Sequence, residues 1–248
     1  TYRVLSRLSS LTQYREVSAT IRMVTDGIIA AVETSAEDHV SDDDLRNLVA
    51  DFEEIAMPRI HELFGAGLDV NTDGHLTILM SCGPNAMVTT GGLMTGFFSP
   101  NDRYARSASN PASNGQEILY TMVPDPDGSC GGTPVSESFT FSILPGVLAH
   151  EYQHLINFDH HVFLYGGSTE EPWLNECLSH VAEDLTGFGN ENPSRVRLFL
   201  AQPQTTAVAP PTSPTLAERG ACYAFLRYLY EQADEPEGFL WSLSNTSR

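Results

Sequence analysis

Lysine is absent from this chain of 248 residues, so all 13 of its basic side chains are arginines. Against them stand 32 acidic residues, which gives a formal net charge of −19 at pH 7. Because phosphate binding needs clustered cations, this balance argues against a nucleic acid or an anionic membrane as the partner. We interpret the acidic excess as a well-solvated surface and not as a site.

Long apolar runs are also missing. No stretch reaches the roughly 20 apolar residues that span a bilayer, and the first residues, 1–3, lack the apolar core of a signal peptide. A hydrophobic content of 41% is ordinary for a globular chain, and no internal repeat is visible. We expect a folded monomer that is a mature or excised domain.

One segment concentrates metal-binding chemistry. Residues 150–154 read His-Glu-Tyr-Gln-His, and Val147-Leu148 and Leu155-Ile156 flank them. On a helix, His150 and His154 lie one turn apart and can point at one metal ion. Glu151 is rotated by about 100° from His150, which places its carboxylate beside the metal. This pattern predicts a catalytic zinc site, with Glu151 as the general base that deprotonates a water during amide hydrolysis.

The helix that carries this motif is expected to start near Pro145 and Gly146, which suit a first turn. A chance match in an amphipathic helix with exposed histidines is the competing interpretation, because short motifs recur by accident. The apolar residues on both sides of the motif weigh against it.

Two residues compete to be the third metal ligand. His160 follows the metzincin spacing, but Asn157 stands in the place of that pattern's glycine, and the required methionine turn is missing because Met122 is the last methionine. Glu176 begins a second helical run that Gly187 can end. We therefore favour His150, His154 and Glu176. The metzincin arrangement stays as the alternative, and otherwise His160 and His161 are expected to be exposed.

The sequences HEYQHLINF and PWLNECLSHVAEDL together resemble the gluzincin pattern, and most closely the hyicolysin-like neutral zinc metallopeptidases. The similarity extends over residues 52–79 and 220–229. It implies a secreted zinc endopeptidase that cleaves peptide or protein substrates. It also implies an α+β, zincin-like fold, with a cleft between a sheet-bearing N-terminal part that includes the motif helix (1–158) and a helical C-terminal part (159–248), in one peptidase unit.

Gluzincins often place an edge strand over the cleft to pair with an extended peptide. The resembling segment is 93–98, and we expect Thr95, Gly96 and Phe97 to contact substrate, although an ordinary sheet strand is as good an interpretation. This segment lacks the acidic residue with which gluzincin aminopeptidases hold an N-terminal amine. The resemblance therefore implies cleavage of internal bonds.

Other family positions are changed. The aspartate that orients a zinc histidine is replaced by His180, so that its role is altered or moves to Glu183 or Asp184. The neighbourhood of the family's oxyanion donor holds Leu216 and Ala217, which cannot donate. The nearest substitutes as transition-state stabilisers are Arg219 and Tyr223.

Cysteine is scarce but even in number, which suits an oxidising compartment. Cys177 follows Glu176 directly, and Cys222 lies in a later helical run where small residues let two helices approach. We predict the disulfides Cys177–Cys222 and Cys82–Cys130. Four buried free thiols are the alternative.

A second metal is suggested by residues 69–74, Asp-Val-Asn-Thr-Asp-Gly, which match the first half of an EF-hand loop. Asp69, Asn71 and Asp73 would supply oxygen ligands to calcium. Met80 stands where the closing glutamate belongs, which favours a plain polar turn.

The first half of the chain reads as scaffold. Alternating and apolar runs predict strands, Asp26-Gly27 predicts a hairpin, and Ser41 is a cap for a helix that Gly65 ends. The expected strands are 17–24, 28–34, 75–81, 93–98 and 117–123. The alternative to an enzyme is a secreted binding module with an inactive metal site. Such a site would not need a general base, so the presence of Glu151 argues against it.

Overall fold

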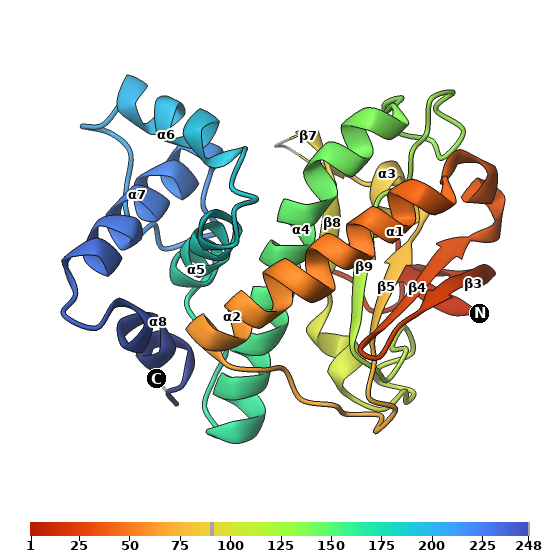
Figure 1. The fold of residues 1–248 in the computed structure, drawn as a ribbon, viewed down its shortest axis with the longest axis horizontal. Helices are drawn as coiled ribbons and strands as arrows, with labels where there is room; N and C mark the ends of the chain where they lie inside the picture. Colours follow the sequence, from red (N-terminus) through yellow and green to blue (C-terminus); the bar gives the residue numbers. More distant parts are fainter. Residues whose placement is uncertain (90–91, 248) are drawn as a thin grey trace. The chain divides into compact units, whose positions relative to one another are not determined.

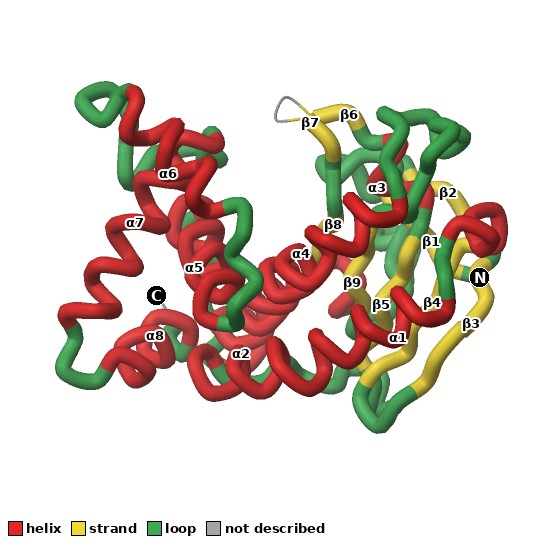
Figure 2. The backbone as a smooth tube through the Cα atoms, turned by 45° about the horizontal axis from the view of Figure 1, so that its top comes forward, coloured by secondary structure: helices red, strands yellow, loops and turns green. Residues whose placement is uncertain are grey.

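The computed structural model describes residues 1–89 and 92–247, and its contacts divide the chain into two units. Unit 1 comprises Thr1–Glu54 and Leu68–Leu148, and unit 2 comprises Ile55–Gly67 and Ala149–Arg248. Unit 1 carries the strands and unit 2 consists of helices and loops in its described part (Figures 1 and 2). The fold is α+β with a mixed sheet, as the sequence predicts.

Unit 1 is built on a five-stranded sheet with the order β3-β4-β5-β9-β8. β3 and β4 form an antiparallel hairpin around Asp26-Gly27, β4, β5 and β9 are parallel, and β8 is antiparallel to β9. β5 is completely buried and almost entirely apolar, as expected for a central parallel strand. The bounds are β3 Ala19–Val24, β4 Ile28–Glu33, β5 Leu76–Met80, β8 Gly96–Phe98 and β9 Ile118–Thr121.

Two strand predictions are corrected. The strand expected over 17–24 is divided, because Val17 ends β2 (Tyr14–Val17), which pairs with β1 (Tyr2–Leu5) in a separate hairpin. The strand expected over 93–98 is also divided. Its first part is β7 (Gly92–Leu93), which pairs with β6 (Val88–Thr89), and only β8 joins the main sheet.

The helical run between Ser41 and Gly65 has the expected ends. α1 (Asp42–Ala50) begins where Ser41 Oγ accepts the N–H of Asp44, and it lies alongside the sheet in both views (Figures 1 and 2). A π-helical turn, η2 (Asp51–Ala56), leads into α2 (Met57–Phe64). Gly65 ends the run with a φ of 94°, a conformation that favours glycine.

The motif helix is longer than predicted. α4 (Glu137–Phe158) begins eight residues before Pro145, where Ser136 Oγ accepts the N–H of Phe139. Pro145 therefore lies inside the helix and not in its first turn. The apolar residues around Pro145 keep the helix intact by burial, since Leu144 and Leu148 are both fully buried.

Unit 2 is held together by helix packing. α7 packs against α5, α6 and α8, and α2 packs against α8. The Asn245 amide donates to the Phe64 carbonyl oxygen (3.1 Å), and Arg59 pairs with Glu237 (3.3 Å). The bounds are α5 Pro172–Leu185, α6 Asn192–Ala201, α7 Leu216–Gln232 and α8 Pro236–Ser244.

The observed division differs from the boundary expected at residue 158. The residues of α4 from Ala149 onward and the α2 segment belong to the helical unit, because α2 packs on α8. Residues 150–154, which carry the histidine motif, therefore lie within unit 2. None of the described helices is both long and apolar enough to cross a membrane.

The remaining elements are short. They are the helix α3 (Cys82–Ala86), the 3-10 helices η1 (Thr34–His39) and η3 (Pro100–Arg103), and the π-helical turn η4 (Asp159–Leu164), which continues α4.

Candidate metal centre

Three predicted ligands converge inside unit 2. His150 and His154 lie on α4, and Glu176 lies on α5. The Nε2 atom of His150 is 3.4 Å from Glu176 Oε2, and that of His154 is 3.9 Å from Glu176 Oε1. Both imidazoles thus present the same ring nitrogen to one carboxylate.

The other ring nitrogens are held by hydrogen bonds. His150 Nδ1 lies 2.6 Å from Glu183 Oε1, so that Nδ1–H is donated to the carboxylate. His154 Nδ1 lies 3.0 Å from Ser179 Oγ, and the Ser179 hydroxyl donates in turn to Gln153 Oε1 (2.6 Å). Partners of this kind fix the tautomer that leaves Nε2 available to a metal.

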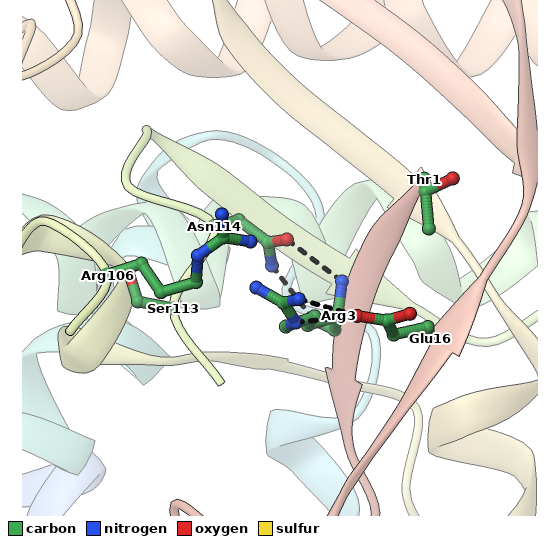
Figure 3. Close-up of a pocket in the computed structure, with 6 residues that line it drawn as sticks. All are labelled: Thr1, Arg3, Glu16, Arg106, Ser113 and Asn114. Carbon is green, nitrogen blue, oxygen red and sulfur yellow. Dashed lines mark hydrogen bonds and ion pairs between the residues drawn. The ribbon is translucent and has the colours of Figure 1, made fainter. Parts of the chain in front are cut away.

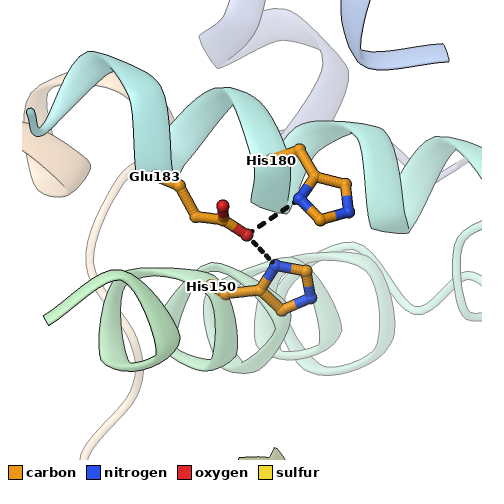
Figure 4. Close-up of side chains that lie close together, drawn as sticks. All are labelled: His150, His180 and Glu183. Carbon is orange, nitrogen blue, oxygen red and sulfur yellow. Dashed lines mark hydrogen bonds and ion pairs between the residues drawn. The ribbon is translucent and has the colours of Figure 1, made fainter. Parts of the chain in front are cut away.

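Glu183 links two histidines behind the candidate ligands. Its Oε1 atom accepts from Nδ1 of His150 and from Nδ1 of His180 (2.8 Å) (Figure 4). Arg195 lies 3.9 Å from its other oxygen. His150, His180 and Glu183 are also grouped closely enough to hold an ion, but their facing atoms are already hydrogen-bonded to one another. We therefore assign Glu183 to orienting His150.

Charge and burial oppose each other in this cluster. Burial disfavours protonation of His150, but hydrogen bonds to Glu176 and Glu183 outweigh it and raise its pKa to about 10. For His154, burial and the charge of His150 lower the pKa. Burial raises the pKa of Glu176, yet the hydrogen bond from His150 and the charge of His154 hold it well below its ordinary value. Glu176 is therefore an anion whose negative charge stabilises nearby positive groups.

The chemistry of this donor set fits zinc. Tetrahedral nitrogen and oxygen ligands at about 2.0–2.1 Å from zinc stand roughly 3.4 Å apart, close to the two separations between histidine and Glu176. In addition, Glu176 Oε2 is buried and lies 2.7 Å from Arg219 Nη1 and 3.4 Å from His150 Nε2, so this carboxylate oxygen already faces cationic groups. His150, His154 and Glu176 would hold the metal.

Glu151 follows His150 on α4 and is half-buried. Its negative charge acts on both histidines, where it favours the protonated imidazolium of each against the effect of burial. The predicted base therefore lies near both candidate ligands.

The two transition-state candidates have different surroundings. Arg219 Nη1 lies 2.7 Å from Glu176 Oε2, so its guanidinium pairs with a candidate metal ligand. Tyr223 is half-buried, and burial and the charge of Asp184, to which it is hydrogen-bonded, raise its pKa to about 12. Its hydroxyl is engaged with Asp184 and not with the three candidate ligands.

His160 and His161 are not exposed, contrary to expectation. They lie in η4 and are 3% and 0% exposed. His160 Nε2 is 2.8 Å from the Ala66 carbonyl oxygen, and His161 Nε2 is 3.3 Å from that of Leu243. Each side chain packs within the helical unit because α4 continues into η4 where a solvent loop was predicted. His160 is bonded to Ala66 and away from the group formed by His150, His154 and Glu176.

The predicted substrate strand lies at a sheet edge in unit 1. β8 is the last strand in the sheet order and pairs with β9 on one side. Gly96 lies against Val147, where a side chain at Gly96 would clash, and Phe97 is buried and stacks on Tyr120 with ring centroids 4.5 Å apart. Thr95 precedes the strand, and its carbonyl oxygen accepts from Met122.

Both predicted cysteine pairs are disulfide-bonded. Cys82 and Cys130 join two parts of unit 1, and Cys177 and Cys222 join α5 to α7 in unit 2. The second bond fastens the helix of Glu176 to the helix of Arg219.

A surface pocket of about 510 Å³ in unit 1 was not predicted. Thr1, Arg3, Glu16, Arg106, Ser113 and Asn114 line it (Figure 3). Arg3 pairs with Glu16 at 2.5 Å, and the Arg3 N–H donates to Asn114 Oδ1 at 2.9 Å. Arg3 thus hydrogen-bonds to both Glu16 and Asn114 within the pocket.

Sequence reasoning missed Ser179 and Arg195. Ser179 lies three residues after Glu176 on the same helix face, a spacing that could have pointed to it. Arg195 comes from α6, which was not predicted as a helix, and no local pattern links it to Glu183.

Comparison with models of known protein families finds no match. The chain is similar to the neutral metalloprotease ShpI of Staphylococcus hyicus, with 28% identity over 151 residues, which is 60% of this chain and 32% of that protein. The chain thus spans about a third of the length of this relative. The similarity establishes a relationship to a metalloprotease.

Proposed function

We propose that this chain is a secreted, zinc-dependent endopeptidase of the gluzincin type, related to the hyicolysin-like enzymes. The observation that carries the proposal is the convergence of two histidine Nε2 atoms on Glu176, with Glu151 beside them. The similarity to a neutral metalloprotease supports the same reaction class. Two disulfides fit an extracellular setting.

Zinc, when bound, supplies Lewis acidity that polarises the scissile carbonyl and makes water acidic enough to lose a proton near neutral pH. His150, His154 and Glu176 are the proposed ligands. Glu151 accepts the proton of the attacking water and delivers it to the leaving amine. This division of roles needs a carboxylate next to the ligands but not among them, which is where residue 151 falls on the helix.

Glu183 and Ser179 act on the ligands and not on the substrate. Each accepts an Nδ1–H bond, which orients one imidazole and increases its basicity toward the metal. Arg219 is the better candidate to stabilise the developing oxyanion. It already lies 2.7 Å from Glu176, whereas Tyr223 is bonded to Asp184. β8, with Thr95, Gly96 and Phe97, is proposed to pair with an extended peptide because it ends the sheet.

The test is chelation and metal restoration. Purified protein is stripped of metal, divided, and supplied with zinc or with magnesium, and each sample is given a library of peptides blocked at both ends. We expect cleavage of internal bonds only with zinc. Stoichiometric zinc binding without any cleavage would instead identify a non-catalytic metal-binding module.

A further inference from the structure

A second group of acidic side chains lies in unit 1. The loop of residues 69–75 leads into β5, and Glu117 immediately precedes β9. β5 and β9 are parallel neighbours, with Thr77 opposite Ile118, and the Thr77 N–H donates to the Glu117 carbonyl oxygen at 2.8 Å. Parallel neighbouring strands begin at the same end of a sheet. Glu117, which precedes β9, therefore lies beside the loop that precedes β5.

Three carboxylates lie close together at this end of the sheet. Asp69, Asp73 and Glu117 each offer an oxygen, and these oxygens lie within 4.8 Å of one another. Asp69 and Asp73 are exposed, whereas Glu117 is 6% exposed. Like charges at this spacing repel one another unless a cation lies among them.

The buried glutamate has an unused oxygen. Glu117 Oε1 accepts from Arg103 (2.8 Å) and from the Val70 N–H, but the buried Oε2 atom has no hydrogen-bond partner. An unpaired buried carboxylate oxygen costs free energy, and such atoms in folded proteins usually mark an ion or an ordered water. With Arg103 as counter-ion, the group of three carboxylates retains two net negative charges.

We propose that Asp69, Asp73 and Glu117 form a calcium site. The donors are all oxygens, which suits a hard cation such as Ca²⁺ and not zinc. Glu117 takes over, from the neighbouring strand, the closing role that Met80 cannot fill in the loop itself. Asn71 holds the loop in shape, since its Oδ1 accepts the Asp73 N–H and its Nδ2 donates to Asp73 Oδ2 at 2.8 Å.

The site makes a prediction that is independent of proteolysis. Calcium would tie the loop before β5 to the start of β9, so calcium removal should loosen this edge of the sheet. Asp69, Asp73 and Glu117 are separate from the proposed zinc ligands, which belong to unit 2.

Equilibrium dialysis with radioactive calcium tests the proposal on the whole chain. We expect one calcium per wild-type chain and a thermal unfolding midpoint that rises with calcium more than with equal magnesium. Asp73→Asn and Glu117→Gln should each weaken calcium binding by at least about tenfold, because each removes ligand charge. Asp38→Asn changes an exposed carboxylate elsewhere in unit 1 and should leave binding unchanged.

Glu117→Gln also disturbs the buried pair with Arg103, so Asp69→Asn provides a further exposed variant that leaves this pair intact. Saturable binding that is lost in Asp69→Asn and Asp73→Asn but kept in Asp38→Asn supports the site. Absence of saturable binding up to about 10 mM calcium, beyond the weakest extracellular calcium modules, would overturn it. Binding that all three substitutions leave intact would also overturn it.

Discussion

Buried carboxylates in the two units meet opposite surroundings. In unit 2, burial raises the pKa of Glu183, but the charge of His180 and the hydrogen bond from His150 outweigh burial. The pKa of Glu183 is therefore well below its ordinary value. In unit 1, Asp102 accepts bonds from the Asn114 N–H and the Tyr120 hydroxyl, and burial prevails to raise its pKa to about 6. Burial alone therefore does not decide the charge of an acid; the charges of its partners do.

This difference explains why the two units suit different chemistry. A carboxylate kept anionic by histidines can orient those histidines toward a metal, which is the role proposed for Glu183 through its hydrogen bond with His150. The hydrogen-bond donors of Asp102 are neutral, and the charge of Arg103 does not offset its burial, so this carboxylate makes unit 1 sensitive to pH instead.

The largest effect is expected from the proposed ligands. His154→Ala and Glu176→Gln should each lower zinc affinity by more than the roughly 10- to 100-fold that is typical of a residue behind the ligands. Zinc per chain is measured after dialysis against a weak chelator. Glu171→Gln, an exposed change just before α5, is the control and should keep full zinc. Full zinc in both ligand variants would move the metal elsewhere, for instance to His180 and Glu183.

The two disulfides close loops of similar length, but they lie in different units. Their sequence separations are 48 and 45 residues, so opening either should cost about 4 kcal/mol of unfolding free energy by the chain-entropy estimate. Replacing Cys177 and Cys222 by alanine should also weaken zinc binding, because the bond fastens α5 to α7. Replacing Cys82 and Cys130 should not. Denaturant unfolding and zinc titration of both double variants check this, and equal zinc loss in the two would contradict it.

Asp102 predicts a pH dependence in unit 1. Its pKa of about 6 exceeds the unfolded value of about 3.9, so the folded state binds the proton more tightly. The stabilisation is fully present below about pH 4 and is lost as the pH rises through about 6, with a total near 3 kcal/mol. The difference in unfolding free energy between wild type and Asp102→Asn, followed from pH 4 to 7, should fall by about 2 kcal/mol of this total. A flat difference would disprove the assignment.

The smallest effect on zinc binding is expected from Glu183, which orients a ligand and is not itself a ligand. Glu183→Gln should weaken zinc binding by about 10- to 100-fold, because His150 loses the charged acceptor that orients it. Asp184→Asn is the matched control, since Asp184 is the next residue on α5 but pairs with Arg227 at 2.8 Å and contacts no candidate ligand. If both variants lost zinc equally, the role given to Glu183 would be wrong.

Local patterns predicted much of this molecule. The hairpin at Asp26-Gly27, the Ser41 cap and the helical histidine spacing depend on residues a few positions apart. The packing of α2 with the helical unit, the burial of His160 and the pairing of Arg219 with Glu176 depend on contacts between distant segments. Hydrophobic periodicity carries no information about such contacts.

The most direct test is Glu151→Gln, compared with wild type and Glu171→Gln after each is loaded with zinc. Zinc content and the hydrolysis of a peptide blocked at both ends are measured on the same samples. The proposed mechanism predicts wild-type zinc in all three and a loss of cleavage of at least about 10²- to 10⁴-fold in Glu151→Gln alone. Cleavage near the wild-type rate by fully zinc-loaded Glu151→Gln would contradict it.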